Sequence, residues 1–243
     1  MKPFVLLATR AEDVPADEEY AAFLRYTGLE ERDLVRVRLE AGPMPHLDLD
    51  GLSGIFVGGG PFNASDPVET KSGVQRRVEH EFDTLLDEVV ARDFPFLGAC
   101  YGVGTLGAHQ GAVIDRRHSE PISVVPVTKT RAGASDPLLD ALPTTFDAFV
   151  GHKEAISQLP RSATLLASSP ACPVQMFRVG ANVYATQFHP ELDVEAITTR
   201  IHAYAGHGYF GADELELTLA AVRRAAVSHP SRMLRTFVER YAR

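Results

Sequence analysis

The chain has 243 residues, enough for one large α/β domain or two small ones with a buried core, which excludes a short disulfide-stapled or fibrous protein. Hydrophobic residues make up 45% and charged residues 23%, as in soluble globular domains and unlike disordered chains. The net charge of −8 predicts no binding to nucleic acid or anionic lipid, and the lack of a long apolar run predicts no membrane span, so we expect a cytoplasmic protein.

The N-terminal half alternates short apolar runs with amphipathic stretches, a pattern typical of βα units around a mostly parallel sheet. We therefore predict an α/β fold with a mostly parallel central sheet flanked by helices. The clearest element is a helix over residues 74–89, whose apolar residues recur at helical spacing. The other predicted elements are strands over residues 4–9, 35–39, 54–57 and 94–99 and helices over residues 18–26 and directly after Cys100.

From about residue 121 the sequence favours strands separated by turns, and beyond Pro190 it favours helices. The last two strands form a hairpin about Gly180 and Ala181, because alternating apolar runs flank a tight turn. We expect one domain over residues 1–200 with a helical extension over residues 201–243 packed on it. The predicted strands cover residues 122–128, 148–150, 164–168, 174–179 and 182–188, and the helices cover residues 194–204, 212–227 and 231–241.

Cys100 lies in the motif Gly-Ala-Cys-Tyr-Gly at residues 98–102, where a predicted strand meets a predicted helix. This pattern is typical of a nucleophile elbow, because a strained strand-to-helix turn needs flanking residues without bulk. The N-terminal end of the following helix favours negative charge on a thiol held there. The alternative is that Cys100 is a small core residue, a common role for a free cysteine and the one we expect for Cys172.

His189 ends the last predicted strand and is followed by Pro190 and Glu191. Side chains two residues apart on an extended segment point to the same side, so we expect Glu191 to reach the His189 ring. A thiolate nucleophile needs a base to manage its proton, and the base needs a group that holds its ring. The alternative is a surface His-Pro-Glu turn. Together with the Cys100 elbow, the pattern favours a Cys-His-Glu catalytic group.

Three glycines at residues 58–60 directly follow a predicted buried strand and precede Pro61. A phosphate loop is disfavoured, because neither a Gly-Lys-Ser/Thr ending nor a G-x-G-x-x-G spacing is present. An ordinary tight turn is the second alternative. We favour an oxyanion hole, in which two loop N–H groups, or one of them with the N–H of Tyr101, stabilise the charge formed when a thiolate attacks a carbonyl.

Three motifs in this order, Gly-Gly-Gly-Pro at 58–61, Gly-Ala-Cys-Tyr-Gly at 98–102 and Gln-Phe-His-Pro-Glu at 187–191, resemble class I glutamine amidotransferase domains, especially those related to GMP synthetase. The resemblance implies the flavodoxin-like fold of that family with a small antiparallel hairpin region. It also implies hydrolysis of the glutamine side-chain amide through a γ-glutamyl thioester, without a cofactor or a metal. By this resemblance Cys100 is the nucleophile, His189 the base and Glu191 the orienting acid, while Gly59, Gly60, Tyr101, Gly104 and His152 border the oxyanion and glutamine site.

Gly104 departs from the family pattern, in which Gln usually stands four residues after the nucleophile and helps to hold the substrate. Glycine removes a polar group and leaves space. We therefore expect either that a larger γ-glutamyl compound fits there or that Gln110 or His152 takes over the contact with the substrate.

Three functions remain open at this point. The first is a glutaminase-type amidotransferase that acts alone or supplies ammonia to a separate synthetase, since no segment resembles the ATP pyrophosphatase domain of GMP synthetase. The second is a γ-glutamyl peptidase or hydrolase, and the third is a catalytically silent binding or regulatory module. The expected ligand is glutamine or another γ-glutamyl compound, and the expected assemblies are a complex with an ammonia-accepting synthetase and a homodimer.

Overall fold

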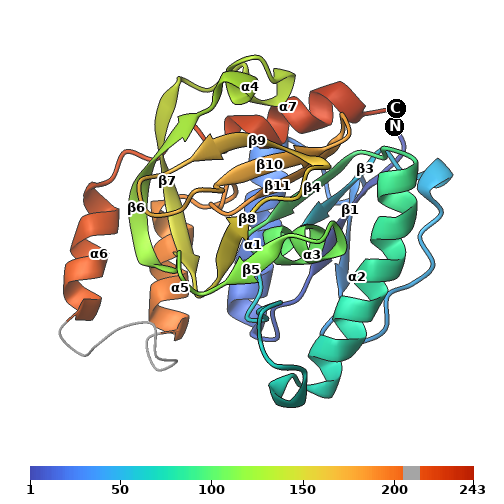
Figure 1. The fold of residues 1–243 in the computed structure, drawn as a ribbon, viewed down its shortest axis with the longest axis horizontal. Helices are drawn as coiled ribbons and strands as arrows, with labels where there is room; N and C mark the ends of the chain where they lie inside the picture. Colours follow the sequence, from blue (N-terminus) through green and yellow to red (C-terminus); the bar gives the residue numbers. More distant parts are fainter. Residues whose placement is uncertain (205–213) are drawn as a thin grey trace.

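The computed structural model describes residues 1–204 and 214–243, and a nine-stranded sheet runs through its centre (Figure 1). The order of strands along this sheet is β2-β1-β3-β4-β11-β10-β9-β6-β7. The parallel strands are β1 (Phe4–Ala8), β2 (Leu34–Arg38), β3 (Gly54–Val57), β4 (Phe96–Ala99) and β11 (Val183–Thr186). Antiparallel pairs extend the sheet through β10 (Met176–Val179), β9 (Ala163–Ser168), β6 (Glu120–Lys129) and β7 (Thr145–His152).

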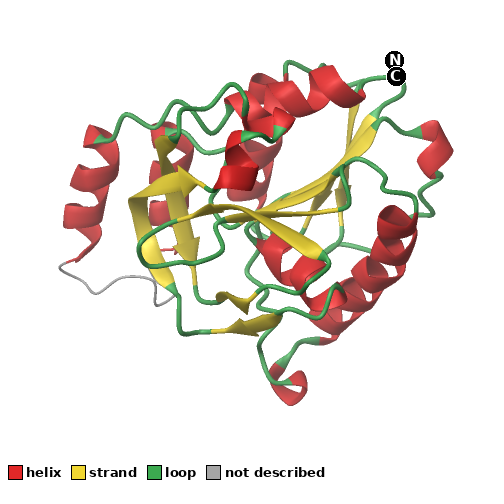
Figure 2. Ribbon diagram, turned by 45° about the horizontal axis from the view of Figure 1, so that its top comes forward, coloured by secondary structure: helices red, strands yellow, loops and turns green. Residues whose placement is uncertain are grey.

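Different helices cover the two faces of the parallel strands (Figure 2). Successive side chains of a strand point to opposite faces, so Phe4 and Val5 of β1 join two separate hydrophobic cores. The helices of the Phe4 core are α1 (Asp13–Thr27) and α7 (Arg232–Tyr241), and those of the Val5 core are α2 (Gly73–Ala91) and α3 (Tyr101–His109). The predicted α/β architecture is therefore confirmed.

The remaining elements lie around this centre. Strands β5 (Val113–Asp115) and β8 (Ala155–Gln158) form a separate antiparallel pair. Helices α5 (Val194–Tyr204) and α6 (Glu214–Arg224) pack in a third core with Ile122 of β6 and Phe149 of β7. The short helix α4 (Arg131–Ala134) and three 3-10 turns, at Leu49–Gly51, Val68–Thr70 and Pro137–Leu139, complete the described elements.

Most predicted elements are present, with ends that differ by a few residues. The predicted hairpin is confirmed: β10 and β11 pair antiparallel about Gly180, whose φ of +58° suits glycine. Strands β5 and β8 were not predicted, because they are short and pair only with each other, outside the main sheet. The helix predicted over residues 212–227 ends at Arg224, and its first two residues lie outside the described residues.

The division of the chain into residues 1–200 and 201–243 remains a prediction. Helix α5 continues without a break through Arg200. Helix α7 contributes directly to the main core, because the ring of Phe237 lies 5.0 Å from that of Phe56 in β3 and both side chains are fully buried.

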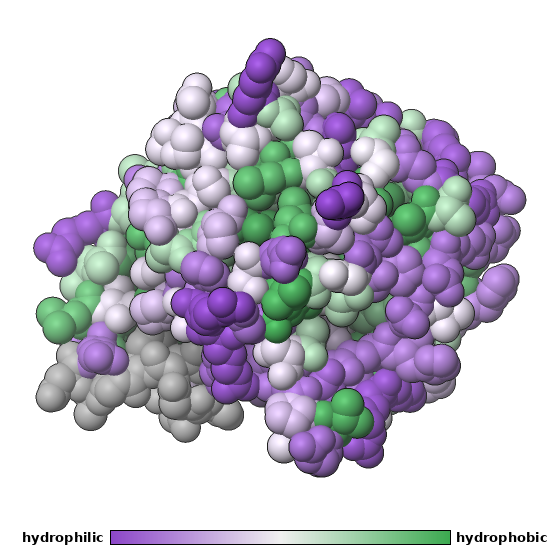
Figure 3. All heavy atoms as spheres, in the orientation of Figure 1, coloured by the Kyte–Doolittle hydropathy of each residue, from purple (hydrophilic) through white to green (hydrophobic). Residues whose placement is uncertain are grey.

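The face shown in Figure 3 is largely hydrophilic, and its hydrophobic residues form several groups separated by hydrophilic ones. Among the described residues, no helix has both the length and the apolar character needed to cross a membrane.

Removal of the Phe237 ring is expected to destabilise the whole domain. Phe237→Ala should lower the free energy of unfolding by about 3–5 kcal/mol, because it leaves a cavity between α7 and the sheet. Urea denaturation followed by circular dichroism measures this change. The control is Leu217→Ala on α6, where the side chain is 71% exposed and the change should stay within about 0.5 kcal/mol. Equal effects of the two substitutions would show that α7 does not belong to the main core.

Candidate active site

Cys100 lies at the sharp turn between β4 and α3. Its backbone angles, φ +52° and ψ −86°, fall in a region that costs a non-glycine residue about 1–3 kcal/mol. A Cβ atom on Gly98 would lie 2.7 Å from Cα of Gly102, so the two ends of the turn approach each other too closely for a side chain at residue 98. The sequence motif therefore does form the tight strand-to-helix turn that a nucleophile elbow requires.

The pairing of β4 with β11 explains how His189 reaches Cys100 from far along the chain. Ala99 lies opposite Thr186 in this parallel pair, and the N–H of Cys100 donates to the carbonyl of Thr186 at 2.7 Å. The carboxyl ends of parallel strands meet at one edge of a sheet. Cys100 and His189 follow these two ends and line the same cavity.

His189 and Glu191 are paired through a 2.7 Å hydrogen bond between Nδ1 and Oε1. The reason differs from the sequence-based expectation. Strand β11 ends at Thr186, so the two residues lie in a turn beyond the strand and not on an extended segment. Within this turn Thr186 Oγ1 donates to the carbonyl of Phe188, and the N–H of His189 donates to Phe149 of β7. Both paired side chains are buried, which isolates their interaction from water.

The charges around His189 favour its protonated form. Burial alone lowers the pKa of the ring, but the Glu191 carboxylate and the Cys100 side chain, which hydrogen-bonds to the ring, raise this pKa to about 9. Burial raises the pKa of Glu191, but His189 and Arg200 outweigh that effect and hold the pKa below its usual range. Glu191 is therefore an acceptor, Nδ1 of His189 carries the donated proton, and Nε2 is the nitrogen left for Cys100.

A buried ionic network supports this pair from behind. Arg200 of α5 donates through Nη2 to Glu191 Oε1 and to Glu19 Oε1, both at 3.1 Å. Arg10, which follows β1, donates through Nε to the same Glu19 oxygen at 3.1 Å and through Nη1 to Tyr204 at 3.0 Å. The network joins helices α1 and α5 to the His189 turn and fixes the orientation of the ring.

The glycines at residues 58–60 have separate tasks. The N–H of Gly59 donates to Glu19 Oε1 at 3.2 Å, so it is already engaged and differs from the free oxyanion donor that we expected. A Cβ on Gly59 would lie 2.7 Å from Cε1 of His189, so glycine is needed here for the ring to approach. Within the described residues, the N–H groups of Gly60 and Tyr101 have no acceptor, and both residues border the cavity next to Cys100.

Gly104 borders open space on one side and a carboxylate on the other. A Cβ on Gly104 would lie 3.0 Å from Oε1 of Glu154 and 3.3 Å from Cβ of Ala64, so a long side chain at residue 104 would meet the Glu154 carboxylate. Gln110 bonds to the neighbouring His109 ring and is absent from the residues that line the cavities at Cys100. Glu154 thus lies beside Gly104, a placement that the sequence did not reveal.

His152 lies in the same wall, but both of its ring nitrogens are occupied. Nδ1 bonds to the carbonyl of Glu154 and Nε2 to Oε2 of Glu120, each at 2.9 Å. Since a carbonyl only accepts, Nδ1 is the donor in the first bond. His152 therefore positions the segment that carries Glu154.

Two cavities meet at Cys100, and they differ in size. The His189 cavity has a volume of about 190 Å³, and its lining combines aliphatic side chains with charged and polar ones, namely Arg10, Glu12, Lys153, His189, Arg200 and Tyr204. The Gly104 cavity has a volume of about 30 Å³ and is lined by Tyr101, Gly104 and Glu154. Gly60, Cys100, Gly151 and Lys153 border both cavities.

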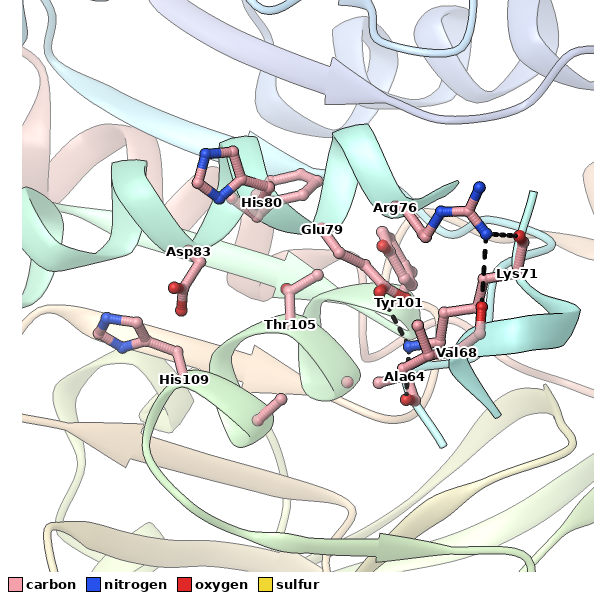
Figure 4. A pocket seen from close by; sticks show the side chains of 13 residues that line it. Ala64, Val68, Lys71, Arg76, Glu79, His80, Asp83, Tyr101, Thr105 and His109 are labelled. Atoms are coloured by element: carbon pink, nitrogen blue, oxygen red, sulfur yellow. Dashed lines mark hydrogen bonds and ion pairs between the residues drawn. The ribbon is translucent and has the colours of Figure 1, made fainter. Parts of the chain in front are cut away.

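A larger hollow of about 360 Å³ lies between α2 and α3 (Figure 4). Tyr101 and Gly104 form part of its wall, but neither Cys100 nor His189 does. The chemistry therefore points to the two smaller cavities as the active site.

Comparison with known protein families matches residues 28–205 to the family described as "Glutamine amidotransferase class-I". The chain belongs to this family. The motif resemblance is thereby confirmed, and the Cys100 turn and the His189–Glu191 pair lie inside the matched region.

The curated relatives of this amidotransferase include GMP synthases and their subunits. A subunit of the glutamine-hydrolysing GMP synthase of Thermoplasma acidophilum is 31% identical over 148 residues, which is 60% of this chain and 66% of the relative. The corresponding protein of Thermoplasma volcanium is 31% identical over 149 residues, or 65% of its length. The GMP synthase of Neisseria gonorrhoeae is 24% identical over 151 residues, which is 26% of that protein. The matched segment thus spans less than two thirds of each of these relatives.

Solved amidotransferase structures share the fold along almost the whole chain. A glutamine amidotransferase from Thermotoga maritima has a TM-score of 0.79 and 21% identity, and the match covers 99% of this chain and 98% of that one. A glutamine amidotransferase from Methylobacillus flagellatus has a TM-score of 0.71 and 17% identity, covering 100% and 96%. At these identities the likeness shows the fold alone.

One group of metal-binding residue types lies beside the amidotransferase site in the described part of the chain. The ligand atoms of Glu120, His152 and Cys172 lie within 4.8 Å of one another. Glu120 is already bonded to His152 and, at 2.7 Å, to Nε2 of Gln175. Burial raises the pKa of the Cys172 thiol to about 12, and the thiol contacts the carbonyl of Val174. Because these residues already bond to one another and to neighbouring protein groups, we interpret them as a polar network between strands. Cys172 is buried, as we expected.

No pattern in the sequence marked Arg10, Glu19 and Arg200 as site residues. Glu19 and Arg200 stand on amphipathic helices, where a charged residue is normally assigned to the solvent side. Their side chains are instead no more than 5% exposed and neutralise one another. Their role depends on contacts between distant segments, which no local pattern encodes.

The raised pKa of His189 makes stability depend on pH. Because the folded pKa of about 9 exceeds the ordinary value of 6.5, His189 stabilises the fold fully below about pH 6.5, and this contribution disappears as the pH rises through about 9. The difference in unfolding free energy between wild type and His189→Gln, measured by urea titration at several pH values, should therefore shrink over that interval. In NMR titrations Cys100→Ala should lower the His189 pKa. A difference in stability that does not change with pH would contradict the assignment.

Proposed function

We propose that this chain hydrolyses the side-chain amide of glutamine at Cys100 and releases glutamate and ammonia. One observation carries the proposal: Cys100 and His189 line one cavity, and Glu191 bonds to His189, in a member of the class-I glutamine amidotransferase family. The thiol stands on an elbow, the imidazole contacts it, and the carboxylate holds the imidazole. This is the order of roles that nucleophilic acyl transfer needs.

In the first half of the proposed reaction, Cys100 Sγ attacks the amide carbon while Nε2 of His189 already holds the proton of the thiol. A C–S bond forms, and the carbonyl oxygen becomes an oxyanion that accepts hydrogen bonds from the N–H groups of Gly60 and Tyr101. When this intermediate collapses, the C–N bond breaks and His189 donates its proton to the departing nitrogen. Ammonia leaves, and a γ-glutamyl thioester remains on Cys100.

In the second half, water attacks the thioester carbon while His189 Nε2 takes one of its protons. The C–S bond breaks, His189 keeps that proton beside the departing sulfur, and glutamate leaves. Glu191 and Arg200 hold the ring in place through both halves and do not exchange protons with the substrate.

We propose that a separate synthetase uses the ammonia that this chain releases. The support is the name of the Thermoplasma relatives, each of which is one subunit of a glutamine-hydrolysing GMP synthase. A protein that only produces ammonia needs a second protein that activates the acceptor. We therefore expect a complex with an ATP-dependent synthetase.

A second candidate function is hydrolysis of γ-glutamyl peptides, and the His189 cavity favours it. The leaving nitrogen must lie on the side of His189 Nε2, which supplies its proton. The cavity on that side measures about 190 Å³, and part of its wall is aliphatic, including Ile122 and Leu192. Ammonia is about the size of water, which occupies only about 30 Å³ in the liquid. A leaving amine with an aliphatic side chain fits this cavity better than ammonia alone.

Glutamate production from glutamine by purified wild type and Cys100→Ala tests the proposed function. We expect turnover by wild type and a loss of at least about 1,000-fold in the variant, because the nucleophile is removed. The control is Cys172→Ala, which removes the other, buried thiol and should retain activity. Equal rates in wild type and Cys100→Ala would refute the proposal.

The same assay with γ-glutamyl-leucine and γ-glutamyl-glycine separates the two enzymatic candidates. Faster turnover of γ-glutamyl-leucine than of glutamine would assign the chain to γ-glutamyl peptide hydrolysis, with the His189 cavity holding the leaving leucine. Faster turnover of glutamine would assign it to ammonia production. Lack of turnover of all three substrates, also with a synthetase partner added, would favour a binding or regulatory module.

A further inference from the structure

A buried arginine with unused hydrogen-bond donors lies in the wall of the His189 cavity. Arg10 is 5% exposed and lines this cavity together with His189. Its Nε donates to Glu19 and its Nη1 donates to Tyr204, but its Nη2 has no acceptor in the described part of the chain. Buried polar groups are normally hydrogen-bonded, so the two N–H groups of Nη2 are left for an acceptor from outside the chain.

Arg200, the other buried arginine of this cavity, has less to offer a ligand. Its Nη2 donates to Glu19 and to Glu191, and its Nη1 lies 3.2 Å from Nδ1 of His189. Both of its terminal nitrogens therefore face protein groups. The free guanidinium nitrogen in this cavity is thus the Nη2 of Arg10.

The free nitrogen of Arg10 lies beside the part of the His189 ring that handles the proton. A Cβ on Gly59 would lie 2.6 Å from Nη2 of Arg10 and 2.7 Å from Cε1 of His189, so these two atoms flank the same point. Cε1 is bonded to Nε2, the nitrogen that gives its proton to the leaving amine in the proposed reaction. The free donors of Arg10 therefore lie next to the place where that amine would be released.

A leaving α-amino acid carries an acceptor that suits this position. Its carboxylate carbon is two bonds from the nitrogen, about 2.5 Å away. Hydrogen bonds between a guanidinium and a carboxylate are among the strongest in proteins, and ammonia and simple amines have no carboxylate. The side chain of an amino acid such as leucine would meet the aliphatic part of the wall at Ile122 and Leu192.

We propose that Arg10 binds the α-carboxylate of the amino acid that leaves when a γ-glutamyl peptide is cleaved. The inference rests on the proposed function in its second form, because it assumes that the peptide is cleaved at Cys100. The C–N bond breaks, His189 donates its proton to the nitrogen, and the carboxylate stays paired with Arg10 until the amino acid leaves. The substrate class is then γ-glutamyl-α-amino acids and not γ-glutamyl amines.

The test compares γ-glutamyl-leucine with γ-glutamyl-leucinamide, in which a neutral amide replaces the leaving carboxylate. Wild type should favour γ-glutamyl-leucine in kcat/KM by about 10- to 100-fold, as expected for a hydrogen bond between charged groups. In Arg10→Gln this preference should fall close to one, mainly through a higher KM for γ-glutamyl-leucine. Arg10→Lys, which keeps the charge, should retain part of the preference.

The ratio of the two substrates separates ligand binding from a structural role of Arg10. If Arg10 only supports Glu19, the substitution will slow both substrates equally and leave the ratio unchanged, which would overturn the proposal. The matched variant is Glu12→Gln, which removes a carboxylate from the same cavity. It should keep or raise the ratio, because Glu12 repels a leaving carboxylate. A fall in the ratio like that of Arg10→Gln would show general damage to the cavity and would also overturn the proposal.

A second measurement needs no turnover. The probe 4-methylpentanoate has the carboxylate and the side chain of leucine but lacks the amine. It should protect Cys100 from iodoacetamide at about one tenth of the concentration that 4-methylpentanamide requires. Equal protection by the two compounds would contradict a carboxylate site at Arg10.

The outcomes distinguish this proposal from the proposed function. If wild type hydrolyses both γ-glutamyl compounds at the same rate, only the carboxylate site is wrong. If it hydrolyses glutamine alone, peptide cleavage is wrong and the carboxylate site with it. If it hydrolyses none of the three and neither probe protects Cys100, the proposed function fails as well.

Discussion

One carboxylate oxygen, Oε1 of Glu19, holds the parts of the site together. It accepts hydrogen bonds from Arg10, from Arg200 and from the N–H of Gly59, so it ties α1 to the end of β1, to α5 and to the glycine loop. Arg200 then connects it to Glu191 and through Glu191 to His189. Loss of one partner from such a buried network costs about 3–5 kcal/mol, because it leaves a charge uncompensated. The network thus links the stability of the fold to the orientation of the His189 ring.

The sequence was sufficient for the fold class and for the residues at Cys100 and His189, because these depend on local signals. Gly98 and Gly102 flank Cys100 closely in the sequence and so indicate a tight turn there. Short apolar runs indicate the strands β4 and β11 that precede Cys100 and His189. The contact between Glu154 and Gly104 could not be predicted from the sequence, because it joins two distant segments, the one after β7 and the first turn of α3. Gly104 alone therefore gave no sign of the carboxylate beside it.

The order of strands explains why the site lies where it does. Strands β4 and β11 are neighbours in the centre of the sheet, so their carboxyl ends place the thiol and the imidazole side by side. The antiparallel strands beyond β11 form the wall opposite, where His152 ends β7 and Glu154 follows it. The parallel half of the sheet therefore contributes Cys100 and His189, and the antiparallel half contributes the wall opposite them.

The division of the site into two cavities at Cys100 has a consequence for the order of events in the proposed reaction. In the reaction that we propose, the acyl group lies on the Gly104 side, and the departing amine and the incoming water share the His189 side. The two cannot occupy the space at Nε2 at the same time, so the first product must leave before hydrolysis begins. An amine that stays in that cavity can attack the thioester and re-form the amide. The rate at which the amine leaves then sets the fraction of thioester that is hydrolysed.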